Sequence, residues 1–207
     1  MKRNMGIEVL FLFFAVFLCG CSATELEDRC FPMMAVIDQQ GEQVTFGYGF
    51  PQLSQKENTD MQESNVNAAI TMGTSLRSCV QQYDEQLEKR TDCNHMKVLV
   101  LGETLIENKE SYEKVLSYLK QTELFPRNTY VCVTPDPDLL FALEDTLSCD
   151  LGSYLEEFLQ NHESDRQIRL WNVGRLLDEQ ENHLLTVSLP YIEVKDNSIL
   201  WTKQFFV

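Results

Sequence analysis

Two short apolar segments near the middle of the chain constrain its fold more than any other feature. They are Met96–Leu101 and Thr129–Thr134, and each is a continuous apolar run of the kind found in strands that are buried on both faces. Pro135 and Pro137 end the second run, because proline cannot donate to a strand ladder. Between the two runs, Ser111–Thr122 carries apolar residues at helical spacing. Strand, helix and strand in this order predict a sheet with helices packed against it.

The two ends of the chain each predict a pair of adjacent strands. Phe31–Ile37 is followed by a short polar turn and by Gln43–Phe50, in which apolar and polar residues alternate. Near the other end, Leu184–Val194 and Ser198–Val207 flank a turn of short polar side chains. A hairpin at each end predicts a sheet that is mixed, or antiparallel at its edges.

The remaining segments predict further helices and one loop. The apolar positions from Asn65 to Leu87 step by three and four, which predicts an amphipathic helix of some six turns with Gly73 in its middle. The polar stretch Pro51–Ser64 has no such periodicity and is expected to be a loop. Three more helices are predicted over Asp138–Leu147, Leu151–Leu159 and Asn172–Leu177. We therefore expect one domain of the α/β or α+β class over residues 29–207, with a mixed β-sheet packed by several helices.

Charge and composition exclude some classes of function. Apolar residues make up 43% of the 207 residues, so a packed core is feasible. The formal net charge is -15, and a surface of this sign repels polyanions. We expect no nucleic-acid partner.

The first residues predict export and a lipid anchor. Lys2 and Arg3 precede an apolar run from Val9 to Leu18, as in a secretory signal peptide. Ten helical residues reach only about 15 Å, half of a ~30 Å hydrocarbon core. The run ends in Leu-Cys-Gly-Cys, which looks like a bacterial lipobox with Cys21 as the lipidated residue and residues 1–20 as the signal peptide. The alternative is an ordinary signal peptide in which Cys21 is an unmodified thiol.

A short tether is expected to join this anchor to the domain. Residues 21–28 span at most about 28 Å when extended, so the domain would be held close to the bilayer. At the end of the tether, Asp28 and Arg29 precede an apolar strand. We expect these two charges to fix the point where the chain enters the domain through an ion pair, with direct contact to a partner as the alternative.

The cysteines and histidines give little support for catalysis or metal binding. Five cysteines follow Cys21, without a CxxC motif: Cys30, Cys79, Cys93, Cys132 and Cys149. Because the number is odd, they cannot all pair with one another. Two possibilities stay open, one internal disulfide or a set of buried thiols. Cys93 and His95 lie close in sequence, but no second ligand pair accompanies them. We expect no catalytic residue, no metal and no cofactor.

Two other groups have a structural and a functional interpretation. An acidic group could suggest calcium, but it lacks the spacing of an EF-hand loop and fits a solvated helix start better: Asp136, Asp138, Glu144 and Asp145. Trp201, Phe205 and Phe206 near the end of the chain fit core or edge packing, and exposed phenylalanines there would mark an interface.

Several segments together resemble one known protein family. They are Cys21, Glu25–Arg29, Gly73–Leu76, Asn94–Glu103, Arg127–Val131, Leu151–Glu156 and Leu189–Pro190. The chain resembles the Ger(x)C family, the C-subunit lipoproteins of bacterial spore germinant receptors. The likeness covers only the amino-terminal domain of that family, whose members carry further carboxy-terminal domains.

The resemblance implies a function that depends on contact with other proteins. It implies a lipoprotein on the outer face of the cell or spore inner membrane, acting without catalysis in nutrient-triggered germination. The implied partners are integral membrane subunits of the germinant receptor, one of them permease-like. The alternative is a solute-binding accessory lipoprotein of a permease-like transporter, which a deep pocket with convergent polar groups would favour.

Overall fold

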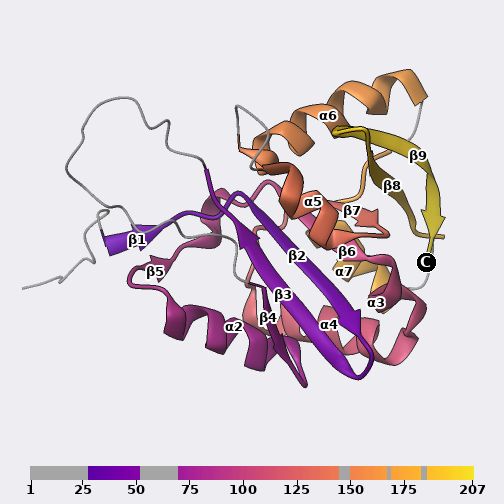
Figure 1. Ribbon diagram of the computed structural model, residues 1–207. Coiled ribbons are helices and arrows are strands. Elements are labelled where there is room, and N and C mark those ends of the chain that lie inside the picture. Colours follow the sequence, from indigo (N-terminus) through magenta and orange to yellow (C-terminus); the bar gives the residue numbers. More distant parts are fainter. Residues whose placement is uncertain (1–27, 52–69, 145–149, 167–168, 183–185) are drawn as a thin grey trace, which may run out of the picture.

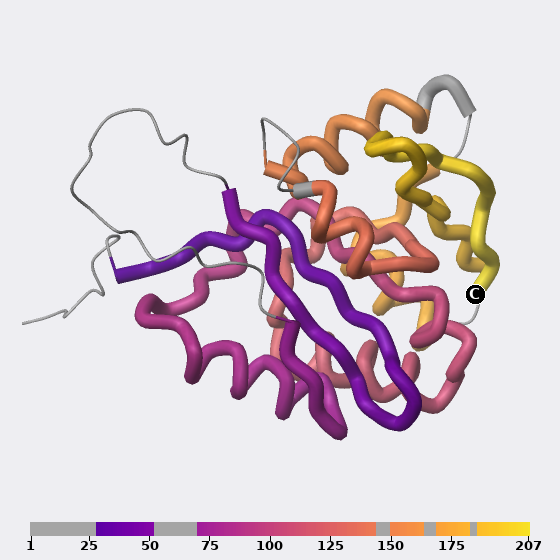
Figure 2. Tube along the Cα trace, in the orientation of Figure 1, coloured from indigo at the N-terminus to yellow at the C-terminus, as the bar shows by residue number. Residues whose placement is uncertain are grey.

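A computed structural model describes residues 28–51, 70–144, 150–166, 169–182 and 186–207 (Figures 1 and 2). The predicted signal peptide, Cys21, Cys149 and nearly all of the predicted 51–64 loop lie outside these residues. Among the described residues, none of the helices combines the length and the apolar character that crossing a membrane would require.

One seven-stranded mixed sheet organises the fold, as the sequence predicts. Its strands, in spatial order, are β4 (Thr71–Gly73), β3 (Gln43–Gly49), β2 (Met34–Gln40), β6 (Val98–Gly102), β7 (Tyr130–Thr134), β8 (Ser188–Lys195) and β9 (Ser198–Phe206). The four strands β2, β6, β7 and β8 run parallel, and the outer strands pair antiparallel. The prediction of antiparallel edges around a buried centre is confirmed.

Helices cover both faces of the sheet, which explains why the central strands are apolar throughout. All five residues of β6 are buried. The helices are α2 (Leu76–Gln86), α3 (Glu103–Glu107), α4 (Lys109–Thr122), α5 (Pro137–Glu144), α6 (Leu151–Arg166) and α7 (Val173–Asn182). One buried cluster joins Ile37 and Leu99 to residues of α2, α3, α4 and α7, and the other joins Val36 and Val100 to residues of α5 and α6. Neighbouring residues of each strand therefore point into different cores.

Both predicted hairpins are present. The turn between β2 and β3 contains Gly41, whose φ of 62° favours glycine. The turn between β8 and β9 is formed by Asp196 and Asn197, with φ of 51° and 57°. Two positive φ angles are typical of the tight turn that matches strand twist, and asparagine and aspartate tolerate them.

The long helix predicted from Asn65 is wrong in its first part. Thr71–Gly73 forms the edge strand β4, and α2 begins only at Leu76. The Thr71 hydroxyl donates to the carbonyls of Phe46 and Cys79, at 3.2 and 3.0 Å, which fixes the segment beside β3. Tertiary contacts thus override a helical spacing that continues backwards through the strand. Gly73 is accordingly in a strand, and residues 65–69 lie outside the described residues.

A second, smaller pairing fixes the start of the domain. Strand β1 (Arg29–Cys30) pairs parallel with β5 (Arg90–Thr91), apart from the main sheet. A single 3₁₀ turn, η2 (Cys93–His95), follows β5 and leads toward β6. The first described residues are therefore joined to a segment some sixty positions later.

Candidate functional site: a groove beside the start of the domain

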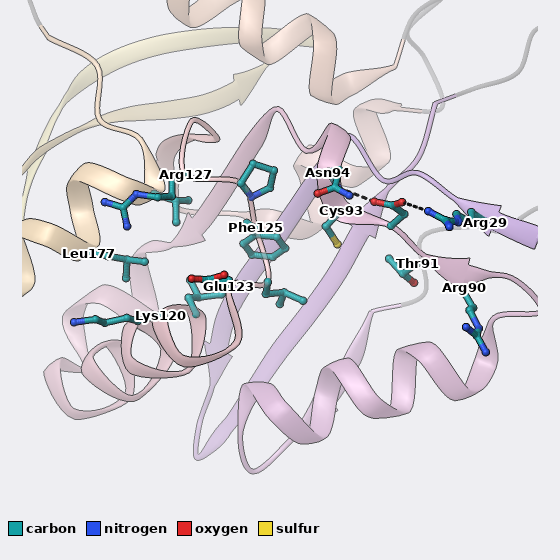
Figure 3. Close-up of a pocket in the computed structure, with 15 residues that line it drawn as sticks. Arg29, Arg90, Thr91, Cys93, Asn94, Lys120, Glu123, Phe125, Arg127 and Leu177 are labelled. Atoms are coloured by element: carbon teal, nitrogen blue, oxygen red, sulfur yellow. Dashed lines mark hydrogen bonds and ion pairs between the residues drawn. The ribbon is translucent and has the colours of Figure 1, made fainter. Parts of the chain in front are cut away.

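A groove of about 620 Å³ lies between β1–β5, the end of α4 and the first turns of α7 (Figure 3). Its volume is within the range of pockets that hold small ligands. Its lining combines charged, polar and apolar side chains: Arg29, Arg90, Thr91, Asp92, Cys93, Asn94, Leu119, Lys120, Glu123, Leu124, Phe125, Pro126, Arg127, Val173 and Leu177. The lining comes from four separate parts of the chain, so no single sequence segment contains the site.

An ion pair on the first rim holds the start of the domain. The Arg29 guanidinium lies 2.9 Å from the Asp92 carboxylate. Asp92 also accepts the backbone N–H of Asn94 at 3.1 Å. This hydrogen bond, with that from Arg29, lowers the pKa of Asp92 and keeps the carboxylate charged. The structure therefore gives Arg29 a partner that sequence reasoning missed, and Asp28 lies exposed beside it.

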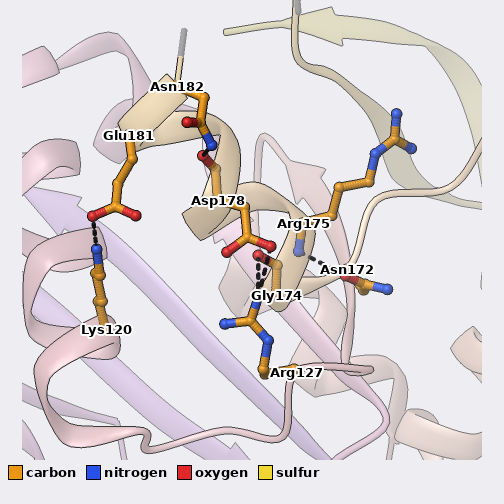
Figure 4. Close-up of polar contacts among 8 residues, drawn as sticks. All are labelled: Lys120, Arg127, Asn172, Gly174, Arg175, Asp178, Glu181 and Asn182. Atoms are coloured by element: carbon orange, nitrogen blue, oxygen red, sulfur yellow. Dashed lines mark hydrogen bonds and ion pairs between the residues drawn. The ribbon is translucent and has the colours of Figure 1, made fainter. Parts of the chain in front are cut away.

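The second rim carries two ion pairs, one from the end of α4 and one from the loop that follows it, and both reach α7 (Figure 4). Arg127 bonds the Asp178 carboxylate at 2.7 Å and the Gly174 carbonyl at 3.2 Å. Lys120 pairs with Glu181. Gly174 is required at this contact, because a Cβ there would lie 2.9 Å from the Cβ of Arg127. The two rims are thus held by different parts of the fold.

The floor between the rims is apolar, and one carboxylate lies over it. Leu119, Phe125 and Leu177 are buried beneath the groove. Glu123 ends α4 with a φ of 48°, in the left-handed region where glycine or asparagine is usual. Its carboxylate is exposed between the rims in Figure 3. The groove therefore offers a mainly polar surface with charges of both signs over a buried apolar base, which suits a polypeptide segment as well as a small polar solute.

The thiol and imidazole near the groove make structural contacts. The Cys93 thiol donates to the Tyr48 hydroxyl at 3.4 Å, and burial raises the pKa of Cys93 to about 11. A thiol with this pKa is largely protonated near neutral pH and is a weak nucleophile. His95 packs edge-on against Phe31, with ring centroids 5.3 Å apart. In the part of the chain that the structure describes, no three His, Cys, Asp or Glu side chains are placed to hold a metal ion.

The other cysteines that the structure describes are also free thiols. They are Cys30, Cys79 and Cys132, in addition to Cys93. No disulfide joins any two of these four, and Cys149 lies outside the described residues. The four described cysteines are therefore buried or half-buried thiols, which is one of the two possibilities that the sequence leaves open.

The structure also shows the surroundings of the acidic group and of the aromatic residues near the end of the chain. Asp136 accepts the backbone N–H of Leu139 at 2.9 Å, as expected for a carboxylate at the start of a helix. The Glu144 side chain and Asp145 lie outside the described residues. Trp201 is buried, whereas Phe206 is 68% exposed. Phe205 is half-buried and stacks on Tyr191, with ring centroids 5.8 Å apart.

Comparison with known proteins gives one match. The family model described as the spore germination protein N-terminal domain matches residues 22–194. Searches of curated proteins and of solved structures returned no match. The matched range includes β1 to β7, all of β8 but its last residue, and every side chain that lines the groove. The chain therefore belongs to the spore germination protein family that this N-terminal domain defines.

Proposed function

We propose that this protein is a lipid-anchored, non-enzymatic subunit of a membrane receptor complex that triggers spore germination, similar to the C subunit of germinant receptors. The observation that carries the proposal is the family match over residues 22–194. The lipobox-like Leu18–Cys21 supports the anchor, since a diacylglyceryl group on Cys21 supplies the two acyl chains that stable anchoring needs. Cys21 lies outside the described residues.

The position of the groove supports docking at the membrane. Arg29 follows the predicted tether directly and forms part of the groove lining. A tether of residues 21–28, at most about 28 Å long, would hold this side of the domain near the outer face of the cell or spore inner membrane. We propose that the groove contacts an exposed segment of an integral, permease-like subunit. The exposed polar and charged side chains of the rims would make most of the contact and set the orientation.

A second function has one observation in its favour. The groove volume also suits a small polar solute, as a solute-binding accessory lipoprotein of a permease-like transporter would require. If the groove only docks onto a partner, we expect free solutes not to bind in it. Solute capture predicts that a small molecule raises the thermal midpoint of the purified protein in proportion to its concentration.

Copurification from the native host tests docking. The full chain is isolated from detergent-solubilised membranes, and its polytopic companions are identified by mass spectrometry. Arg127→Glu reverses a charge on the groove rim at a side chain that is 67% exposed. We expect this variant to lose most of its companion, because the rim then repels the carboxylates that Arg127 would attract.

A matched variant separates docking from a general effect of charge. Lys195→Glu makes the same change at an exposed residue before the β8–β9 turn, away from the groove lining. It should retain the companion at the wild-type level. Wild-type protein recovered without any polytopic companion, or equal losses in both variants, would contradict docking through the groove.

A further inference from the structure

The two edges of the sheet differ in a way that points to a second interaction surface. β4, at one edge, has three residues, whereas β9, at the other, has nine. Within the described residues, β9 pairs only with β8. A long open edge strand presents unpaired backbone groups and is a template for pairing with another strand, and proteins commonly shorten or cover such edges. β4 is short in this way, whereas β9 is long and open, with a β-bulge opposite Tyr191 and Ile192 and the single lysine Lys203 as its only interruptions.

The hydrogen-bond register shows which backbone groups of β9 point away from the sheet. The Val207 N–H donates to the Val187 carbonyl at 3.0 Å. Inward and outward residues alternate in an antiparallel pair, so the backbone groups of Phe206 and Gln204 are directed outward. Pro190 lies opposite Gln204 and has no N–H to donate, which agrees with this register. An added strand would find donors and acceptors here.

The exposed side chains of this edge are partly apolar, and within the described residues the carboxylates that contact it belong to neighbouring elements: Glu193 of β8, which accepts the Thr202 hydroxyl at 2.7 Å, and Glu103 of α3. Among the described residues, six large apolar side chains are exposed, and three of them are Leu200, Phe206 and Val207. Residues 198–207 contain no Asp or Glu, and Lys203 is their only charged side chain, in a chain with a net charge of -15. Lys203 in turn lies 4.0 Å from the centre of the Tyr191 ring and 3.9 Å from the Glu103 carboxylate. Two copies of an acidic chain repel each other, and strand β9 itself adds no carboxylate side chain to that repulsion.

The edge is also remote from the proposed membrane contact. Figure 1 shows β1 and β9 on opposite sides of the molecule. The groove lining includes no residue of β9. Docking through the groove and pairing through β9 are therefore compatible.

From these observations we propose that β9 pairs antiparallel with β9 of a second copy, about a two-fold axis, so that two seven-stranded sheets become one continuous sheet. Antiparallel pairing of identical strands is self-complementary, and each copy supplies the partner that the other lacks. The nine residues of β9 extend over about 30 Å. The inference does not depend on the lipid anchor or on the receptor complex.

Sedimentation equilibrium of the purified full chain, in detergent matched to the solvent density, tests this inference. We expect wild type to sediment at twice the mass of the chain. Phe206→Glu places a carboxylate at the edge in each copy, and Phe206→Pro removes an outward N–H donor. Each variant should weaken association at least tenfold, while its far-ultraviolet circular dichroism matches that of wild type.

Met72→Glu is the control, because Met72 is 49% exposed on the opposite edge strand β4. It should dimerise as wild type does. A monomeric wild type at concentrations up to about 0.1 mM would overturn the proposal. Association that Met72→Glu and the Phe206 variants weaken equally would also overturn it, since that result indicates β4-to-β9 stacking into open chains.

Discussion

At the scale of single residues, Asp38 is the most informative side chain of the core. It is only 6% exposed at the end of β2, and its carboxylate accepts the backbone N–H of Leu105 at 3.1 Å. A Cβ on Gly102 would lie 1.8 Å from its Oδ1 atom, so a glycine at the end of β6 makes room for this contact between β2 and α3. Burial raises the pKa of Asp38 above its ordinary value of 3.8, although the Leu105 N–H opposes the shift. The Asp38 carboxylate thus stabilises the start of α3, while burial disfavours its charged form.

This raised pKa predicts how stability depends on pH. In the unfolded chain Asp38 titrates near 3.8, and in the folded protein it binds its proton at higher pH. Folding therefore takes up a proton between these two pKa values, and the free energy of unfolding falls as pH rises through the folded pKa. Asp38→Asn retains an oxygen acceptor for Leu105 and abolishes the titration. We expect wild type to gain stability relative to Asp38→Asn as pH is lowered from 7 to about 4.

Urea unfolding of both proteins at several pH values measures this difference. Glu42→Gln, at an exposed carboxylate in the turn after β2, is the control and should follow wild type. Parallel curves for wild type and Asp38→Asn, or a gain of wild type with rising pH, would show that burial of Asp38 does not control the titration.

At the scale of elements, the sequence predicts those helices and strands whose own residues show a clear pattern, and it misses those that depend on contacts with other segments. The buried strands β6 and β7 and the β8–β9 hairpin follow from apolar runs and from Asp196 and Asn197, whose backbone angles the turn requires. The sequence does not predict the short helix α3, because its five residues are too few for a periodicity to be visible. The sequence pattern wrongly places β4 in a helix, because its three residues continue the spacing of α2 and only contacts with β3 distinguish them.

The true start of α2 gives a prediction at this scale. Ser75 caps the helix: its hydroxyl accepts the Ser78 N–H at 3.3 Å, and the Ser78 hydroxyl accepts the Ser75 N–H at 3.2 Å. Ser75→Ala removes one acceptor for the first turn and should lower the free energy of unfolding by about 1 kcal/mol. Gln82→Ala, on the exposed face of the same helix, should change it by less than about 0.5 kcal/mol. Equal effects of the two changes in urea unfolding would mean that α2 begins before Ser75.

At the scale of the whole molecule, the groove shows where sequence reasoning ends. The position of Arg29 after the predicted tether makes it a candidate, but the Asp92 carboxylate with which it pairs lies 63 residues away. Lys120, Arg127 and the apolar floor belong to segments whose patterns indicate only an ordinary amphipathic helix and a loop. Their convergence follows from the β1–β5 pairing and from the packing of α7 beside α4. No local pattern records these contacts.

The central claim is that a lipid on Cys21 holds this acidic domain at the membrane, where it acts by contact. Mass spectrometry of the amino-terminal peptide, on protein from the membrane fraction of the native host, tests it most directly. The account predicts that the peptide begins at Cys21 and carries a diacylglyceryl group, and that Cys21→Ala, but not Cys19→Ala, releases the protein from the membrane fraction. An unmodified Cys21 on protein recovered free from the medium would contradict it.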